Sequence, residues 1–324
     1  MATQLLSCPR HTVRRNVPPS TRVKYNNRMT IVAGFVNDNG VLLCADTLTT
    51  DGGVTAVYRS KIIPVFLGDG KAFFAFGGDV KFSELAIQRC ERMLHRYNGA
   101  PRSVAEIAET IRKQWHSAFR ESHTQDVYSG DQILCAIHAE ANAETALYSS
   151  SNQFFARATN NVECIGCGES VARYLMGSRF QSCVTTQRNA FQYAINALGR
   201  VKEFMAGSVG GNLTAVNLNH DGSEHIYSQR DIERIERYAG QFDSAARDLL
   251  IYFMDHDAPG RFEDEFSRFA AEVNGIRWQW ENALAGAAQI EFLPMEIMDA
   301  FRKAKPPDPL STRGDPSHPQ PSPE

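Results

Sequence analysis

Two short apolar runs separated by a turn signal constrain the first part of this chain most strongly. Residues 30–36 and 41–46 are apolar stretches of strand length, and residues 37–40 between them read Asn-Asp-Asn-Gly. Asparagine, aspartate and glycine suit tight hairpin turns because they tolerate positive φ angles. The sequence therefore predicts an antiparallel strand pair that begins at Thr30 and ends at Asp46.

The ends of this predicted hairpin carry residues that suit nucleophilic catalysis. Thr30 opens the first strand, Asp46 closes the second, and Lys61 lies on the next extended segment. A threonine hydroxyl is a weak nucleophile that needs a neighbouring base. The α-amine of an N-terminal threonine can be that base, because its pKa of about 7.7–8.0 leaves it partly neutral near pH 7. A lysine ammonium held by Asp46 would lower the pKa values of both groups.

This arrangement resembles the N-terminal hairpin of proteasome β-type subunits and bacterial proteasome-like peptidases, which are N-terminal-nucleophile hydrolases. The resemblance covers residues 30–228 and implies an α+β chain folded as a four-layer αββα sandwich. It implies that Thr30 is the nucleophile, with Asp46 and Lys61 tuning it. It also implies that Gly77 supplies a backbone N–H to the oxyanion of the tetrahedral intermediate.

Two glycine-rich turns extend the resemblance and also mark where the chain departs from it. Residues 165–168 resemble the family's Gly-Ser-Gly turn, and residues 209–211 resemble its Ser-Gly-Gly turn. Active members carry a serine in the first turn, and an aspartate and a serine near the second. The matching positions here are Cys167, Ala206 and Val209. Ser208 would restore a hydroxyl after a one-residue shift, and Lys61 lies one residue earlier than the family's lysine.

Residues 1–29 form a basic leader before Thr30, with arginines and a lysine but no acidic residue. Three origins are open: a propeptide, an organelle-targeting segment, or a stretch upstream of a true start at Met29. We favour the start at Met29, followed by the propeptide. A secretory signal is not indicated, because the segment has no apolar core. Only a chain that begins at Thr30 carries the free amine that the chemistry requires.

Strands and helix pairs alternate through the rest of residues 30–228. Asp79 is a predicted N-cap, and Ser103 with Glu106 forms a capping box that opens a second helix. Antiparallel strands separated by helix pairs predict helices on both faces of stacked sheets. The predicted strands cover residues 71–76, 132–138, 145–148, 162–165, 213–219 and 225–228, and the predicted helices cover residues 79–97, a segment after 103, a segment after 168, and 187–204.

The composition excludes several classes of protein. The chain has 324 residues, 43% hydrophobic and 22% charged, which suits a globular protein with a sizeable core. A net charge of -3 argues against nucleic-acid binding, and no apolar stretch is long enough for a membrane span. Cysteines in apolar runs, such as Cys44 and Cys135, suggest reduced thiols and a cytoplasmic protein.

One cysteine pair is a candidate metal or redox motif. Cys164 and Cys167 form a Cys-x-x-Cys sequence, which occurs in zinc sites and in thiol oxidoreductases. Structural zinc requires four ligands, and no second pair completes the set. We therefore favour a packing role for these cysteines and expect no metal and no organic cofactor.

The last part of the chain lies outside the resemblance. Residues 229–304 carry apolar residues at helical spacing, including Ile232 and Ile235, and predict a helical extension that covers the domain or meets a neighbouring subunit. Residues 305–324 are rich in proline and are predicted to be disordered.

Three functions remain as hypotheses. The first is a threonine-type endopeptidase that self-associates into a ring or another closed oligomer and cleaves peptides or unfolded proteins. The alternative is a catalytically inactive, proteasome-like assembly subunit, which the missing acidic partner and the leader favour. The third is a small-amide hydrolase of the same superfamily. The sequence does not specify an ATPase or another regulator.

Overall fold

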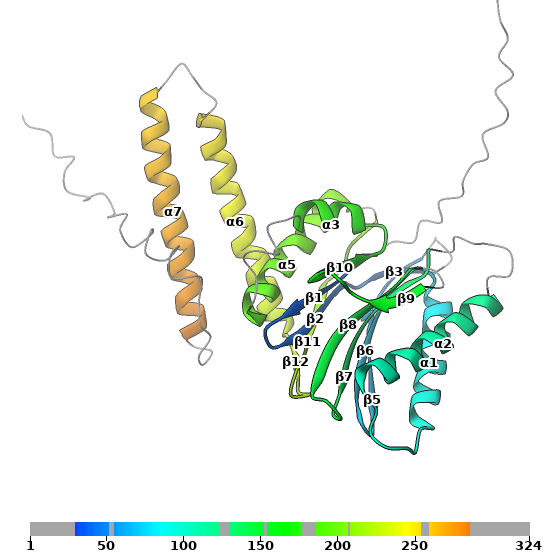
Figure 1. The fold of residues 1–324 in the computed structure, drawn as a ribbon. Helices are drawn as coiled ribbons and strands as arrows, with labels where there is room; N and C mark the ends of the chain where they lie inside the picture. Colours follow the sequence, from blue (N-terminus) through cyan, green and yellow to red (C-terminus); the bar gives the residue numbers. More distant parts are fainter. Residues whose placement is uncertain are drawn as a thin grey trace, which may run out of the picture.

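The computed structural model describes residues 30–51, 55–122, 130–151, 154–176, 186–206, 208–253 and 259–285 (Figure 1). The leader at residues 1–29 and the proline-rich tail at residues 305–324 lie outside the described residues, so the predictions for them stay predictions. The described chain mixes six helices with antiparallel sheets, as the sequence predicts.

The first sheet contains the predicted hairpin. Its order is β10-β1-β2-β11-β12, and every neighbouring pair is antiparallel. The hairpin closes where Asn37 pairs with Gly40, and a Cβ on Gly40 would lie 2.0 Å from the Leu218 carbonyl oxygen. Glycine is therefore required at this turn for space. The strands are β1 (Val32–Asn37), β2 (Gly40–Asp46), β10 (Val162–Ile165), β11 (Leu213–Asn219) and β12 (Glu224–Ile226).

The second sheet has the order β5-β6-β7-β8-β9 and is also antiparallel throughout. A separate strand pair, β3 with β4, leaves the first sheet directly after Asp46. The strands are β3 (Leu48–Asp51), β4 (Thr55–Tyr58), β5 (Ile62–Leu67), β6 (Gly70–Gly77), β7 (Gln132–Ala139), β8 (Glu144–Ser151) and β9 (Phe154–Arg157).

The first two helices begin where the sequence places their caps. The Asp79 side chain accepts a hydrogen bond from the Phe82 amide at 2.9 Å, and the Ser103 amide donates to the Glu106 carboxylate at 2.8 Å. Both contacts satisfy backbone donors that a helix start leaves free. The helices are α1 (Val80–His95), α2 (Val104–Ser122), α3 (Glu169–Met176), α5 (Gln187–Phe204), α6 (Gln229–Phe253) and α7 (Pro259–Ala285).

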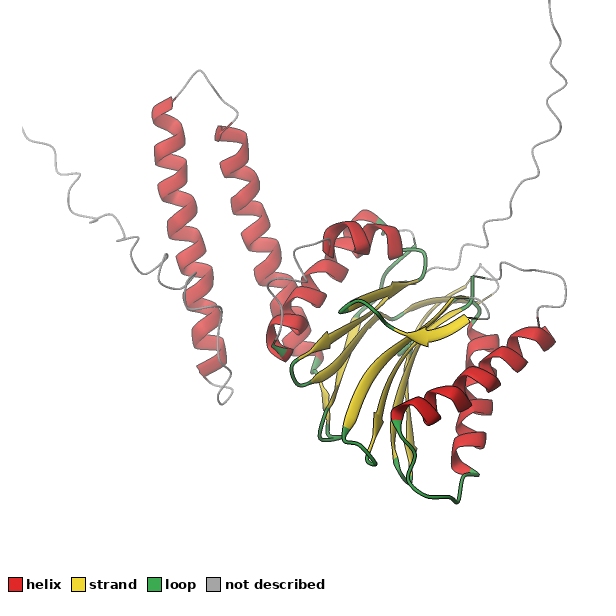
Figure 2. Ribbon diagram, viewed as in Figure 1, coloured by secondary structure: helices red, strands yellow, loops and turns green. Residues whose placement is uncertain are grey.

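Three buried apolar clusters hold these elements together. One lies between the two sheets and includes Leu43, Phe73 and Leu134. A second joins α1 and α2 to the β5–β9 sheet, and a third joins α3, α5 and the start of α6 to the other sheet. Figure 2 shows the sheets stacked at the centre, with helices on both sides.

Two helices, α6 and α7, follow the last strand. Ile232 and Ile235 of α6 are buried in the cluster beneath the first sheet, whereas α7 packs against α6. Figure 1 shows α7 on the side of α6 that faces away from the sheets. Within the ranges that the structure describes, no helix combines the length and apolar character of a membrane span.

Candidate active site

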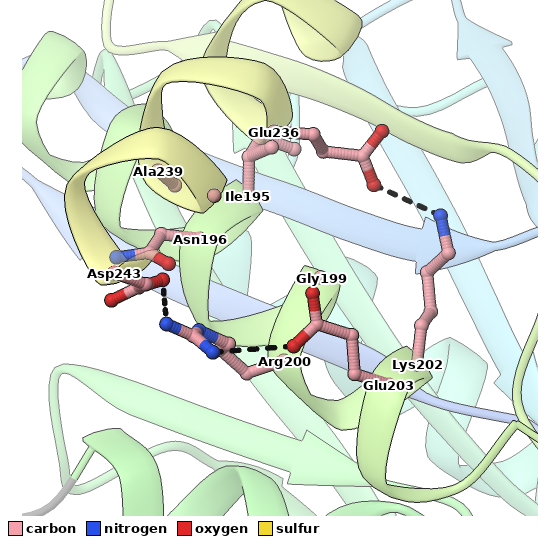
Figure 3. Close-up of a pocket in the computed structure, with 10 residues that line it drawn as sticks. Ile195, Asn196, Gly199, Arg200, Lys202, Glu203, Glu236, Ala239 and Asp243 are labelled. Carbon is pink, nitrogen blue, oxygen red and sulfur yellow. Dashed lines mark hydrogen bonds and ion pairs between the residues drawn. The ribbon is translucent and has the colours of Figure 1, made fainter. Parts of the chain in front are cut away.

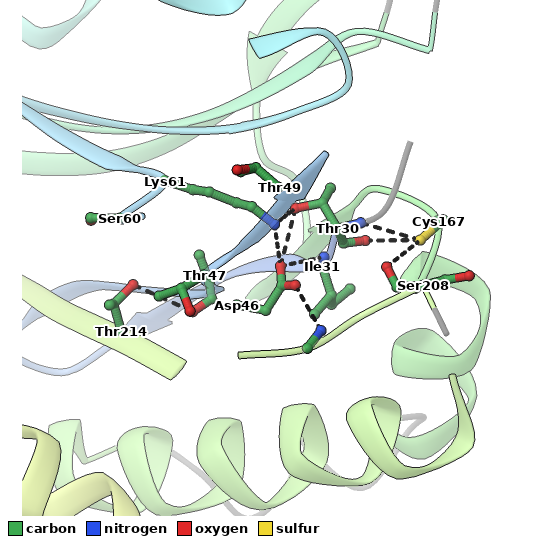
Figure 4. Close-up of polar contacts among 12 residues, drawn as sticks. Thr30, Ile31, Asp46, Thr47, Thr49, Ser60, Lys61, Cys167, Ser208 and Thr214 are labelled. Carbon is green, nitrogen blue, oxygen red and sulfur yellow. Dashed lines mark hydrogen bonds and ion pairs between the residues drawn. The ribbon is translucent and has the colours of Figure 1, made fainter. Parts of the chain in front are cut away.

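Thr30, Asp46 and Lys61 meet near the ends of strands from the two sheets (Figure 4). Asp46 is the last residue of β2, and Lys61 directly precedes β5 in the other sheet. Thr30 lies two residues before β1 begins at Val32, so the prediction that it opens the strand is slightly wrong. All three are buried, with exposed fractions of 3% for Thr30, 0% for Asp46 and 1% for Lys61.

Asp46 is the centre of this cluster. Its Oδ1 accepts hydrogen bonds from the Thr30 hydroxyl at 3.1 Å and the Ile31 amide at 2.9 Å. The same oxygen pairs with Lys61 Nζ at 2.5 Å, and Oδ2 accepts from the Gly210 amide at 3.1 Å. A buried carboxylate needs such partners, because an unpaired charge away from water is costly. Asp46 therefore ties the start of β1 to β5 and to the turn before β11.

Lys61 Nζ also donates a hydrogen bond to the Thr30 hydroxyl oxygen. Burial lowers the pKa of Lys61 from its ordinary value, and the charge of Asp46 and its hydrogen bond oppose that shift. An ammonium beside a hydroxyl stabilises the alkoxide, and a lowered pKa eases proton exchange between the two groups. The Thr30–Lys61 contact therefore suits activation of the threonine oxygen.

Two glycines let the backbone approach Thr30 closely. A Cβ on Gly77 would lie 2.9 Å from the Thr30 methyl carbon, and a Cβ on Gly166 would lie 2.5 Å from the Thr30 carbonyl oxygen. Gly166 also has a φ of +99°, which side chains other than glycine rarely adopt. The structure thus brings Gly77, the predicted oxyanion donor, against the predicted nucleophile.

Cys167 is the side chain that meets the backbone nitrogen of Thr30. Its sulfur accepts from that N–H at 3.3 Å, and the thiol donates to the Thr30 carbonyl at 3.3 Å. The thiol also reaches the Ser208 carbonyl oxygen at 3.6 Å, so Ser208 presents its backbone to Cys167. Because Met29 precedes Thr30 in this chain, the nitrogen is an amide. Burial raises the pKa of the Cys167 thiol, so the neutral form is favoured.

Part of this site is not evident in the sequence. Cys167 stands out there as a departure from a motif, but nothing marks it as a direct contact of Thr30. The structural roles of the Gly166 backbone and the Gly210 amide are likewise missed. The available signal is the pair of glycine-rich turns, because glycine marks close backbone approach.

The two cysteines of the Cys-x-x-Cys motif lie in different surroundings. Cys164 is buried in the cluster beneath the first sheet, whereas Cys167 is exposed beside Thr30. Within the described ranges, no three histidine, cysteine or acidic side chains are grouped to hold a metal ion.

A polar pocket lies between α5 and α6, and none of the Thr30 cluster lines it (Figure 3). Arg200 pairs with Asp243 and with Glu203, and Lys202 pairs with Glu236 at 2.9 Å. The cationic groups of this pocket are therefore already neutralised by carboxylates of the chain itself.

Comparison with solved structures places the fold among Anbu proteins. Anbu from Hyphomicrobium sp. strain MC1, solved as a Gly-1 mutant, has 15% identity and a TM-score of 0.56, covering 70% of this chain and 100% of that one. Anbu from Yersinia bercovieri, described as an ancestral β-subunit, has 16% identity and a TM-score of 0.56, covering 70% and 97%. Anbu from Pseudomonas aeruginosa, solved as a helical assembly of the Anbu complex, has 17% identity and a TM-score of 0.55, covering 69% and 96%.

Neither a family model nor a curated protein matches the sequence. The identification as a proteasome β-type subunit or bacterial proteasome-like peptidase is therefore wrong, because these neighbours are Anbu proteins, which are proteasome-like but distinct. The resemblance rested on a hairpin and two glycine-rich turns, and local features of this kind do not identify a family by themselves.

Proposed function

We propose that this chain is a subunit of a self-assembling, proteasome-like particle of the Anbu type. The observation that carries the proposal is the likeness to the Hyphomicrobium Anbu chain, which extends over 100% of that chain at a TM-score of 0.56. The Pseudomonas aeruginosa neighbour supports self-association, because it was solved as a helical assembly. Fold does not fix function by itself, so the proposal requires its own test.

The proposal includes the finer account of the fold. Residues 30–228 would form a four-layer αββα sandwich, and residues 229–304 would form its helical extension. The support is the succession of three apolar clusters, one between the sheets and one beneath each group of helices.

Analytical ultracentrifugation of the full chain tests the assembly. We expect particles many times heavier than the 36.1 kDa monomer, and electron microscopy should show rings or helical turns. A species that stays at the monomer mass up to tens of micromolar would refute the proposal.

A second function is favoured by the Thr30 cluster, namely threonine-type peptide-bond hydrolysis. In a chain that begins at Thr30, the freed amine would take the hydroxyl proton, through a bridging water. The Thr30 oxygen would then bond to the substrate carbonyl carbon. Lys61, held by Asp46, would stabilise the alkoxide, and the Gly77 amide would donate to the oxyanion. When the tetrahedral intermediate collapses, the C–N bond breaks and the Thr30 ammonium gives its proton to the leaving amine; water then hydrolyses the ester, which releases the acid and restores the Thr30 hydroxyl.

Labelling with an epoxyketone tests this second function, because the reagent bonds to both the hydroxyl and the free amine of an N-terminal threonine. We expect one adduct per chain, lost in Thr30→Ala, in a preparation that begins at Thr30. An exposed threonine on the same chain, Thr159, offers a matched control: Thr159→Ala should label like the wild type. A correctly folded preparation beginning at Thr30 that does not label would rule out this chemistry.

A further inference from the structure

The outer face of α7 is a surface that neither proposed function uses. α7 packs against α6, where the rings of Phe269 and Phe242 meet edge to face at 6.0 Å. Residues on this side of α7, such as Val273 and Ile276, are half-buried. The opposite side of the helix is exposed from residue 264 to residue 278.

The exposed side of α7 carries a regular stripe of residues, which we call the outer stripe. Its members follow one another in alternating steps of four and three residues, which places them on one side of the helix. The outer stripe consists of Asp264, Arg268, Ala271, Gly275 and Trp278.

Two features of the outer stripe suggest that something covers it. Trp278 is 66% exposed, although indole is among the side chains that contribute most when buried at interfaces. Gly275 lies inside a helix, where glycine is less favourable than alanine, and a Cβ there would meet nothing within 4 Å. A glycine in such a position allows another backbone to approach closely.

The centre of the outer stripe is complementary to itself. When two copies of α7 lie antiparallel with Ala271 of one opposite Gly275 of the other, the same register brings Arg268 opposite Trp278. Each contact occurs twice, because a two-fold axis relates the copies. The Arg268 side chain is 53% exposed. Its guanidinium already meets Glu265 and Glu272 of its own helix, and its planar face can stack on an indole.

We propose that the outer stripe is a two-fold self-association surface whose partner is α7 of a second copy of this chain. Small residues meet at the centre of the contact, and an arginine–tryptophan pair closes each end. The self-complementarity favours a second copy over an unrelated protein, because one register satisfies both kinds of pair. The inference rests on the proposed assembly and assigns it one contact surface.

Sedimentation of full-length variants tests this surface. Trp278→Ala removes the aromatic group of both end pairs. Gly275→Leu blocks the close approach, while leucine strengthens the helix itself, so weaker association would not come from a lost helix. Tyr174→Ala is the control, because Tyr174 is an 85% exposed aromatic on α3 and not on α7.

We expect Trp278→Ala and Gly275→Leu each to raise the concentration of half-assembly by at least about 100-fold, since each change acts twice in a symmetric contact. Tyr174→Ala should leave it within about threefold of the wild type. Arg268→Glu should weaken assembly, and Arg268→Lys should restore part of it because the cation is kept.

The outcomes separate this inference from the proposed function. A monomeric wild type would refute the assembly and, with it, this contact. A wild type that assembles, with unchanged assembly in both Trp278→Ala and Gly275→Leu, would leave the proposed function standing and overturn this inference alone. In that case the outer stripe has a different occupant, such as the chain's own C-terminal residues or another protein.

Discussion

Replacing Lys61 with methionine is the sharpest test of the buried cluster. The Lys61–Asp46 pair is almost fully removed from water, with side-chain exposures of 2% and 0%. Methionine keeps most of the buried aliphatic length but removes the positive charge, which leaves the Asp46 carboxylate buried without its counter-ion. Breaking such a pair from one side costs about 3–5 kcal/mol. We expect the free energy of unfolding to fall by that amount at pH 7.

Denaturant unfolding measures this loss, at one fixed protein concentration because assembly shifts apparent stability. The control is Arg157→Met, which breaks the Arg157–Glu144 ion pair, whose side chains are 58% and 33% exposed. Pairs of that kind contribute about 1 kcal/mol or less. The double variant Asp46→Asn with Lys61→Met should be more stable than Lys61→Met alone, because the amide carries no orphan charge. A Lys61→Met cost no larger than that of Arg157→Met would refute the reasoning.

Three further predictions concern single positions. Arg102 lowers the pKa of Asp69, so the Asp69–Arg102 pair stabilises the fold above the ordinary pKa of aspartate. This stabilisation is lost as pH falls through the lowered pKa. Asp69→Asn should therefore make stability less dependent on pH in acid unfolding, which circular dichroism measures. Ser103→Ala should cost about 1 kcal/mol in denaturant unfolding because it removes a helix cap. Gly166→Ala should lower the melting temperature, because its Cβ would lie 2.5 Å from Thr30 atoms at a φ of +99°.

The sequence predicts the central strands and helix starts well, for a physical reason. Local rules act within a few residues: the turn at Gly40 needs glycine, and Asp79 and Ser103 cap helices through contacts three residues away. β2 and β7 are buried along almost their whole length, so each appears in the sequence as a continuous apolar run. These elements could be predicted because each carries its own signal.

Other elements have no comparable signal. β3 reads Leu-Thr-Thr-Asp and β9 is mostly exposed, so neither shows a long apolar run. The contact between Cys167 and Thr30 joins residues 137 positions apart and depends on how β10 pairs with β1. Pairings of that kind are set by the whole fold, and the two glycine-rich turns indicated only that some close approach occurs there.

The Thr30 cluster has a structural role and, in the second proposed function, would also have a chemical one, and this bears on how the two proposed functions can be separated. Asp46 joins the start of β1 to Lys61 and to the Gly210 amide, so an inactive subunit would keep the same three residues to hold its sheets together. The group that differs between the functions is the Thr30 nitrogen, which is an amide after Met29 and an amine in a chain that begins at Thr30. Intact mass and N-terminal sequencing of the protein from its own source measure that difference. A chain that begins at Thr30 supplies the general base and favours hydrolysis; a chain that retains Met29 lacks that amine and leaves the assembly role alone.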